Sequence, residues 1–283
     1  MIPAPLRARI EAQLGVIVRA TPMGAGAHHV ETSRGSYFLK TGGAGTFEAE
    51  AQGLEALRAA AEGTAIRIPR VYLASDAHGL LAIDWIAVGR PDRTAWARFG
   101  EALAALHRRP APGRGWGFGR DNFIGPTPQP NGWLEDWPTF FRERRLLPQM
   151  DLARRRGRWL PRWDRPAERL LDRLPDLLPS APPRSLLHGD LWSGNHLTDA
   201  AGTPWLVDPA VYVGDREADL AMTELFGGFD PAFYAAYESA WPHEPGYAER
   251  REVYNLYHLL NHLNLFGSGY AAGVERVLLR FGT

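Results

Sequence analysis

The sequence predicts an α+β protein with two lobes: a small antiparallel-sheet lobe with one helix, and a larger, mainly helical lobe. Three observations support this fold class. Short strand-like segments separated by turns fill residues 1–88, with one helical segment among them. Apolar residues recur at helical spacing from residue 94 onward. A polar, turn-rich segment, residues 187–208, then interrupts the helices. We therefore expect residues 1–88 to form the small lobe and residues 89–283 the larger one.

The composition is that of an ordinary globular protein. The chain has 283 residues, of which 45% are hydrophobic and 23% charged, which is enough for a large core. The formal net charge is zero, so nothing in the overall charge favours a polyanionic partner. The absence of cysteine excludes disulfides and thiolate catalysis and suits a cytoplasmic protein. Residues 1–14 contain no apolar segment that would predict a signal peptide or a membrane anchor.

The first elements are predicted to be a short helix and a hairpin. Residues 5–14 are typical of an amphipathic helix, and residues 16–18 and 29–31 are typical of strands. Gly24 and Gly26 stand between these strands. Two close glycines in a hairpin could let backbone N–H groups approach phosphate groups, although a plain turn would also use them.

The next strand, residues 36–40, ends in the single lysine of the chain, Lys40, among 32 basic residues. Arginine replaces lysine freely on a solvated surface but not where a compact ammonium is needed, so a retained lysine predicts such a site. The following helix, residues 46–61, has Thr46 as its expected N-cap and carries Glu48 and Glu50 in its first turn. We expect Glu50 to pair with Lys40, with Glu48 as the alternative.

Two further strands, residues 68–74 and 80–86, complete the predicted small sheet. The second strand should lead out of the lobe. Asp84, Trp85 and Ile86 are therefore expected to begin a hinge that ends near Val88.

The larger lobe begins with a helix at residues 94–108 and contains another at 166–178. Residues 110–133 are rich in glycine, proline and aromatic residues and fit no regular period. Residues 142–165 hold nine arginines against three acidic residues. A nucleic-acid patch is one interpretation of this run, and a solvated helical face is the simpler one.

Residues 187–208 contain the polar motif around which the chain is organised. His188, Gly189 and Asp190 are followed by Asn195, and Asp208 ends a short apolar run. Residues 195–197 and 205–207 are predicted to be the strands of a hairpin that would bring Asp208 beside Asn195. Phosphoryl transfer needs a carboxylate to accept a proton and oxygen ligands for Mg²⁺. A chance His-Gly-Asp in an ordinary hairpin is the alternative explanation.

This motif resembles the catalytic segment of the kinase superfamily, and the expected fold is accordingly protein-kinase-like. The resemblance implies that Asp190 is the catalytic base and that Asn195 and Asp208 bind Mg²⁺. Lys40 would neutralise the phosphates of ATP, and the hinge from Asp84 would face the adenine ring. The glycine that follows the motif's histidine points to the small-molecule branch, which includes the aminoglycoside and choline kinases.

Other polar residues have supporting roles in this interpretation. Asp219, in a helix predicted from residue 215, would hold the backbone of the catalytic loop, and as a first-turn carboxylate it would also suit the helix dipole. His188 is expected to pack against the turn at Asp208. His258 and His262 have the spacing of a zinc-binding pair but lack a glutamate between them, so no zinc site is predicted.

A more specific resemblance covers nearly the whole chain. The matching segments are long, occur in order and are rich in aromatic residues. They are residues 117–125, 129–133, 136–146, 188–195, 215–223, 225–229 and 257–267. They resemble the fructosamine-3-kinase (ketosamine-3-kinase) family. That resemblance implies ATP-dependent phosphorylation of the sugar 3-hydroxyl of a ribulosamine, erythrulosamine or fructosamine adduct. The phosphorylated adduct would then eliminate and restore the amine, which is deglycation.

The same resemblance implies the cofactors and partners. ATP and Mg²⁺ are the expected cofactors, and glycated small amines or glycated proteins the expected substrates, with no nucleic acid, no membrane and a monomeric state. Trp192 is expected to stack on the sugar or amine, with a packed core indole as the alternative. His258 and His262 are expected to line the acceptor pocket or otherwise to pack the lobe.

Two departures from the resemblance matter. Some relatives carry a cysteine in the glycine-rich loop, and this chain has none, so regulation by thiol oxidation is not expected. Asp208 is followed by Pro209 and not by phenylalanine, so the regulatory flip of protein kinases is not expected either. A small-molecule kinase with another acceptor, of aminoglycoside or choline type, is the runner-up. A pseudokinase is disfavoured because Lys40, Asp190, Asn195 and Asp208 are all present.

Overall fold

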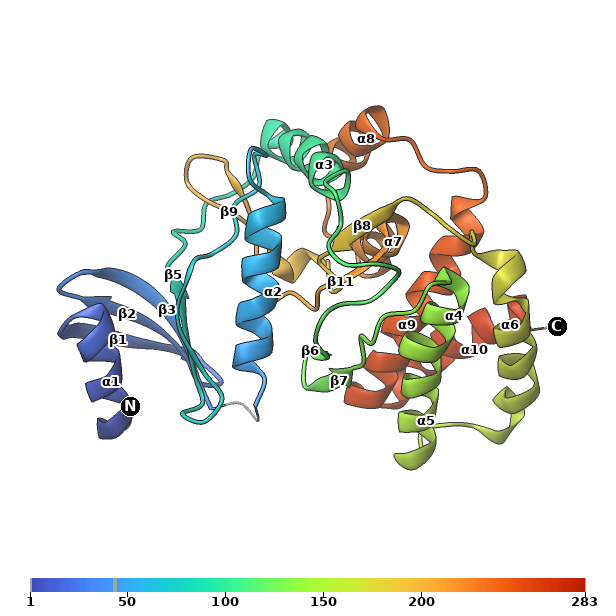
Figure 1. Ribbon diagram of the computed structural model, residues 1–283, viewed down its shortest axis with the longest axis horizontal. Coiled ribbons are helices and arrows are strands. Elements are labelled where there is room, and N and C mark those ends of the chain that lie inside the picture. Colours follow the sequence, from blue (N-terminus) through green and yellow to red (C-terminus); the bar gives the residue numbers. More distant parts are fainter. Residues whose placement is uncertain (1, 43–44, 283) are drawn as a thin grey trace.

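The computed structural model describes residues 2–42 and 45–282 and has the two-lobed α+β architecture expected from the sequence (Figure 1). The small lobe holds a five-stranded antiparallel sheet in the order β1-β2-β3-β5-β4. The elements of this lobe are α1 (Ala4–Leu14), β1 (Ile17–Gly24), β2 (Ala27–Thr32), β3 (Gly35–Thr41), α2 (Phe47–Ala60), β4 (Val71–Ser75) and β5 (Leu80–Asp84). The boundary at residue 88 stays a prediction.

Alternation along β3 sends its side chains to opposite faces of the sheet. Leu39 is fully buried and packs with Ile10 of α1 and Leu80 of β5. Lys40, the next residue, therefore lies on the other face, which α2 covers with the buried Leu54. Helix α1 thus covers one face of the sheet and α2 the other. Lys40 lies on the α2 face, on the side toward the larger lobe.

The larger lobe is mainly helical, with three short two-stranded sheets. Its helices are α3 (Arg93–His107), α4 (Trp137–Phe141), α5 (Leu147–Arg155), α6 (Asp164–Leu177), α7 (Arg216–Leu225), α8 (Pro231–Ala240), α9 (Tyr247–Phe266) and α10 (Ala271–Phe281). Its strands are β6 (Asn122–Ile124), β7 (Thr127–Gln129), β8 (Arg184–Leu187), β9 (His196–Thr198), β10 (Pro204–Leu206) and β11 (Tyr212–Asp215). Within the described ranges, no helix is long and apolar enough to cross a bilayer.

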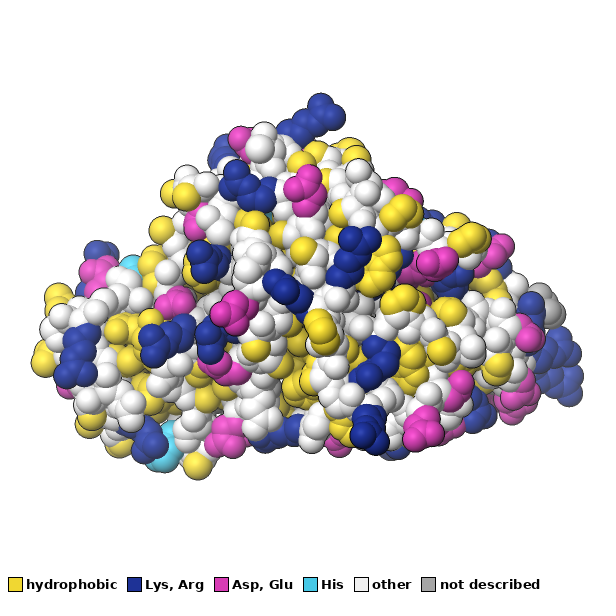
Figure 2. Space-filling view, turned by 45° about the horizontal axis from the view of Figure 1, so that its top comes forward, with side chains coloured by type: hydrophobic (Ala, Val, Ile, Leu, Met, Phe, Trp, Pro, Cys, Tyr) yellow, Lys and Arg dark blue, Asp and Glu magenta, His cyan; other side chains and the backbone are white. Residues whose placement is uncertain are grey.

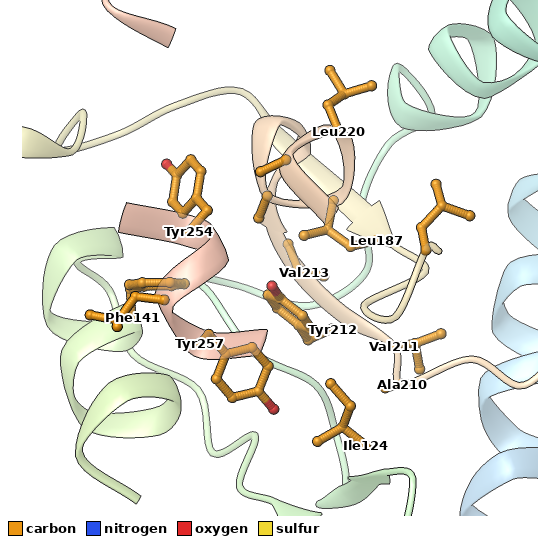
Figure 3. Close-up of a cluster of buried hydrophobic side chains, with 14 of the residues drawn as sticks. Ile124, Phe141, Leu187, Ala210, Val211, Tyr212, Val213, Leu220, Tyr254 and Tyr257 are labelled. Atoms are coloured by element: carbon orange, nitrogen blue, oxygen red, sulfur yellow. The ribbon is translucent and has the colours of Figure 1, made fainter. Parts of the chain in front are cut away.

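The core of the larger lobe lies directly behind the polar motif. Leu187 on β8 pairs in register with Tyr212 on β11, and Val213 and Leu220 lie beside them (Figure 3). Tyr254 of α9 closes the cluster from the opposite side. The loop that follows β8 is therefore anchored on a rigid, buried pair of strands.

Three local expectations change in the structure. β4 begins at Val71 and not at residue 68, because Pro69 has no N–H to donate to the sheet. The segment at 110–133 is an ordered loop that contains the β6–β7 hairpin. Within the part of the chain that the structure describes, the Thr46 side chain makes no capping hydrogen bond, because its backbone is already helical (φ −109°, ψ −17°).

Candidate active site

Lys40 lies at the end of β3 between two carboxylates. Its Nζ is 2.8 Å from Glu50 Oε1 and 2.6 Å from Asp208 Oδ1. Burial opposes the charge on the ammonium, but the two carboxylates outweigh it and raise the pKa of Lys40. Glu48 turns elsewhere and accepts from the Asp76 backbone N–H at 3.3 Å. Glu50 is thus the partner of the lysine, and the pair reaches across to the turn of the larger lobe.

Asp190 and Asn195 lie together in the loop after β8. Asn195 Nδ2 donates to the Asp190 carbonyl oxygen at 2.8 Å and is 3.3 Å from its Oδ2. Burial raises the pKa of the Asp190 carboxyl to about 7, against the hydrogen bond from Asn195, and the charge of Asp208 adds to the rise. A carboxylate whose pKa lies near neutrality is suited to accept a proton from a substrate hydroxyl.

Gly189 is required by a close backbone approach. Its φ is +82°, and a Cβ at this position would lie 2.0 Å from the Ala210 carbonyl oxygen. The neighbouring His188 carbonyl accepts the Ala210 N–H at 2.8 Å. Glycine therefore lets the loop after β8 lie directly against the segment that follows Asp208. Asp208 itself has a left-handed φ of 55°.

Asp219 supports this loop from α7. Its two carboxylate oxygens accept the backbone N–H groups of His188 at 2.7 Å and Gly189 at 2.9 Å. His107 Nε2 also lies 3.3 Å from this carboxylate, a partner that the sequence did not suggest. Burial lowers the pKa of His188, so its ring is neutral and Nε2–H donates to the Val207 carbonyl at 2.9 Å. Both residues thus make the contacts expected of loop supports.

Two cavities meet at Asp208. The larger, about 510 Å³, is lined by the charged residues and by the β6–β7 hairpin: Lys40, Thr46, Phe47, Glu50, Asn122, Phe123, Gly125, Pro126, Asp190, Trp192, Asn195, Asp208 and Pro209. The smaller, about 280 Å³, is mainly apolar and is lined by Met23, Phe38, Ile83, Asp84, Trp85, Ile86, Val88, Gly194, Leu197, Val207 and Asp208. The expected hinge residues line the smaller cavity. A mainly apolar cavity beside a charged one suits a purine and its phosphates, respectively.

The glycines of the β1–β2 turn lie outside both cavities, as far as the described residues define them. Gly26 has a φ of +81°, and a Cβ there would meet the Thr41 carbonyl oxygen at 2.3 Å. The turn geometry alone therefore requires this glycine. Contact of Gly24 and Gly26 with phosphates stays a prediction. Met23, near the end of β1, does line the smaller cavity.

Trp192 lines the larger cavity and is 41% exposed. Its ring lies over Gly194, where a Cβ would come within 2.3 Å of the indole. The alternative of a packed core indole is therefore wrong, and one face of Trp192 remains open toward the cavity.

The two histidines of α9 follow the second of the two expectations and pack the lobe. Within residues 2–42 and 45–282, neither is among the residues that line the two cavities. His258 is only 4% exposed, and the His262 ring packs on Phe226 with 4.6 Å between centroids. The face of α9 that carries His258 packs into the lobe. The cavity wall is formed by Phe123 and Pro126 instead.

We expect buried His258 to make the fold less stable in acid. Burial lowers its pKa to about 3, with the charges of His262 and Arg145 acting in the same direction and that of Asp219 opposing. Above pH 6.5 the ring is neutral in both states and has no effect. As the pH falls below 6.5, only the unfolded chain takes up the proton, which costs about 2 kcal/mol of stability at pH 5.

His258→Gln should remove this share of the pH dependence. Urea unfolding of both proteins at pH 7.5 and pH 5 measures it. If the two proteins lose the same stability between these values, His258 is not the buried neutral group described above.

Arg145 is a buried cation that the sequence did not predict. It lies in the π-helical turn Arg142–Leu146, within the run expected to be a solvated helical face. Its side chain is fully buried, and its guanidinium lies 3.9 Å from the centroid of the Tyr212 ring. It donates to Asn131 Oδ1 and to the Pro130 carbonyl, both at 2.7 Å. Burial lowers the pKa of Arg145, and the surrounding tyrosines oppose this shift.

A chain of amide hydrogen bonds connects Arg145 with the segment after Asp208. Asn131 Nδ2 donates to Asn122 Oδ1 at 2.9 Å, and Asn122 Nδ2 donates to the Val211 carbonyl at 2.8 Å. Gln129 donates to the Ala210 carbonyl at 2.9 Å and accepts from Tyr257 Oη at 2.7 Å. Tyr212, Tyr257, Ala210 and Val211 lie close together in Figure 3. The network thus fixes the β6–β7 wall of the larger cavity against the segment after Asp208.

Replacing the Arg145 guanidinium should lower the stability of the fold. Arg145→Leu leaves the Asn131 side chain and the Pro130 carbonyl buried without a donor, so we expect a loss of about 3 kcal/mol in the free energy of unfolding. Arg142→Leu is a matched control, because Arg142 is partly exposed and pairs with Glu143 at the surface. The control should lose less than about 1 kcal/mol. Equal effects in urea unfolding would contradict the role given to the network.

Among the other arginines of this run, Arg142, Arg154 and Arg162 form ion pairs within the described residues. Arg154 contacts Asp151 and Asp164, and Arg162 contacts Glu275. Acidic and basic side chains are interspersed on the face drawn in Figure 2. The surface arginines of the run are thus partly paired, and a solvated face stays the simpler interpretation of them.

The fold and the site together define an ATP-dependent kinase. Its parts are a lysine–glutamate pair in a small sheet lobe, an apolar cavity lined by residues that follow β5, and an Asp-Asn-Asp set on the larger cavity. The family model for fructosamine kinase matches residues 16–281, and the chain belongs to that family.

Individual relatives agree with this assignment. A probable ketoamine kinase from Synechocystis sp. is 47% identical over 234 residues, which cover 82% of this chain and 77% of that protein. A chloroplastic protein-ribulosamine 3-kinase from Arabidopsis thaliana is 38% identical over 258 residues, covering 89% of this chain and 78% of that one. A Thermobifida fusca crystal structure that bears the name of a fructosamine-3-kinase has a TM-score of 0.88 at 34% identity and covers 97% of this chain and 98% of its own.

More distant structures share the fold alone. The choline kinase of Streptococcus pneumoniae has a TM-score of 0.68 at 15% identity, over 98% of this chain and 97% of its own. The kinase-like fold expected from the sequence is thereby confirmed, and the acceptor is not decided by this likeness.

Proposed function

We propose that this chain transfers the γ-phosphoryl group of ATP to the 3-hydroxyl of a ketosamine, a ketose joined to an amine by glycation. The observation that carries the proposal is the arrangement on the larger cavity, where Lys40 bridges Glu50 and Asp208 and where Asp190 lies beside Asn195. Relatives named for ketoamine and ribulosamine substrates support the acceptor class. The phosphorylated adduct would eliminate and release the amine, so the reaction would begin deglycation.

The donor set fits Mg²⁺ better than a transition metal. Asn195 and Asp208 offer an amide and a carboxylate oxygen on the cavity wall. Across the described ranges, no group of three His, Cys, Asp or Glu side chains is placed to hold a metal. Mg²⁺ commonly uses one or two protein oxygens together with substrate phosphates and water. Asn195 and Asp208 would hold the ion, and the ion would neutralise charge on the nucleotide phosphates.

Side chains of this protein would bind the phosphates and accept the proton. The Lys40 ammonium, held by Glu50, would bind the nucleotide phosphates and would exchange its present contact with Asp208 for them. Asp190 would orient the acceptor hydroxyl and accept its proton. The hydroxyl oxygen then forms a bond to the γ-phosphorus, and the bond from that phosphorus to the β–γ bridging oxygen breaks. The electron pair of the broken bond leaves with ADP.

The cavity favours a sugar over a polycationic acceptor. The carboxylates that line it, within the described part of the chain, are Glu50, Asp190 and Asp208, and all three belong to the phosphoryl-transfer set. An aminoglycoside or choline site would need further groups to compensate the positive charges. The open face of Trp192 offers instead a surface on which a sugar ring can stack.

An acceptor panel tests the proposal. Mg²⁺-dependent release of ADP is measured with ribulosyl-, erythrulosyl- and fructosyl-lysine, with kanamycin and choline as controls. Turnover of a ketosamine without turnover of the controls is the expected result. Turnover of kanamycin or choline alone would show that the acceptor class is wrong.

A further inference from the structure

The larger lobe contains a further cavity, of about 280 Å³, apart from the site described above. It lies where the end of α7 meets α9 and α10, and both α7 and α10 pack against α9 (Figure 1). Within the described ranges, it shares no residue with the two cavities that meet at Asp208. We call it the α7–α10 cavity. Its lining residues are Glu224, Leu225, Arg251, Glu252, Asn255, Leu259, Arg276 and Val277.

Asn255 is an unexpected residue for its place in α9. It lines the cavity together with Arg251 and Leu259, which lie one turn away on either side along the helix, and it is only 7% exposed. Its Oδ1 atom is buried and has no hydrogen-bond partner within residues 2–42 and 45–282. A buried amide oxygen without a partner lowers stability, and leucine would form the helix better. Because no contact within the described chain compensates this loss, Asn255 indicates a ligand.

The other amides buried on α9 have partners. Asn261 Oδ1 accepts from Gln149 Nε2 at 3.3 Å, and Asn264 Nδ2 donates to the Gln149 carbonyl at 2.8 Å. Both residues therefore join α9 to α5. Asn255 differs because the space beside its side chain is the α7–α10 cavity.

Charged groups of both signs surround Asn255. Glu224 pairs with Arg251, and Glu252 pairs with Arg276, so these four side chains have no net charge. Each arginine bonds its partner through Nη1 in the described structure, which leaves further N–H groups for a ligand. The rest of the lining is apolar: Leu225, Leu259 and Val277.

These groups match a small zwitterion that has an apolar side chain. A ligand carboxylate can accept hydrogen bonds from Arg251 and Arg276. A ligand ammonium can donate to Asn255 Oδ1 and to the neighbouring carboxylates. A side chain can pack on Leu225 and Leu259, and the volume is sufficient for one amino acid. We propose that the α7–α10 cavity binds a free α-amino acid with an apolar side chain. This inference does not depend on the proposed function.

Calorimetric titration of the full-length protein tests the ligand class with three probes of one shape. L-Leucine carries both charged groups, 3-methylbutan-1-amine lacks the carboxylate, and 4-methylpentanoate lacks the ammonium. We expect L-leucine to bind with a Kd of about 1 mM or below. Each of the other two probes should bind at least about tenfold more weakly, because it leaves one set of charged groups without a partner.

Variants locate the site. Asn255→Leu should weaken the binding of L-leucine at least about tenfold, because it removes the amide oxygen. Its Tm without ligand should equal or exceed that of the wild-type protein, since leucine has a similar branched shape and no unpartnered polar atom. Arg276→Gln should weaken binding about tenfold. Arg280→Gln is the matched control for it, because Arg280 also pairs with Glu252 but is not among the described residues that line the cavity. The control should change Kd less than about twofold.

Several results would overturn the proposal. If the wild-type protein did not bind L-leucine and Asn255→Leu had a much lower Tm, the amide would serve the fold alone. Unchanged L-leucine binding in Asn255→Leu would place the ligand elsewhere on the protein. Binding of 3-methylbutan-1-amine or 4-methylpentanoate as tight as that of L-leucine would show that the cavity does not select a zwitterion. All of these results are independent of phosphoryl transfer at Asp190.

Discussion

Asp190→Asn should lower kcat on a ketosamine by about 10³-fold, while the affinity for ATP changes less than about threefold. The amide has nearly the shape of the carboxylate and can keep the contact with Asn195, which is 3.3 Å away. It cannot accept the proton of the acceptor hydroxyl. Steady-state kinetics and nucleotide titration measure the two effects separately.

Glu48→Gln serves as the control for this prediction. Glu48 is a carboxylate in the first turn of α2, as Glu50 is, but it contacts Asp76 and not the site. Its substitution should leave kcat within about twofold. Full activity in Asp190→Asn would refute the assignment of Asp190 as the base.

Lys40→Arg should lower kcat/KM for ATP by about 10²-fold. Lys40 is a compact charge held 2.8 Å from one carboxylate and 2.6 Å from another. Arginine keeps the charge, but its longer planar fork cannot take the same position between Glu50 and Asp208. The deficit should appear mainly with ATP as the varied substrate, because the lysine is placed to bind phosphates.

The control for Lys40→Arg is the reverse exchange at the surface. Arg58→Lys alters an exposed side chain of α2 that pairs only with Glu55 among the contacts described. It should leave kcat/KM unchanged within about twofold. If Lys40→Arg also left kcat/KM for ATP unchanged, the interpretation of the single retained lysine would be wrong.

The parts of the site that lie in short sequence motifs were predictable. Asp190 and Asn195 are five residues apart in one loop, so their proximity follows from the chain itself. Lys40 and Glu50 are ten residues apart on a strand and the next helix, and strand alternation places the lysine on the face that α2 covers. Gly189 was predicted as a mark of the family, and the structure adds the cause, which is the approach of the Ala210 carbonyl.

The parts that depend on tertiary packing were not predictable. From the sequence alone, Arg145 looks like another surface arginine. Its burial is produced by Tyr212 and Tyr257, which come from distant parts of the chain. A signal was present in the loop before it, since Asn122, Gln129 and Asn131 would need polar partners if buried. The two roles left open for His258 could not be separated, because helical spacing shows which residues share a face but not whether that face meets a cavity or the core.

The central claim is that this site phosphorylates the 3-hydroxyl of a ketosamine. The most direct test is ³¹P and ¹H NMR of the product formed from ATP and free ribulosyl-lysine with Mg²⁺ present. The account predicts a phosphate ester coupled to the proton on carbon 3 of the sugar, formed by the wild-type protein and absent with Asp190→Asn. A phosphate ester on another hydroxyl, or on the amine carrier, would contradict it.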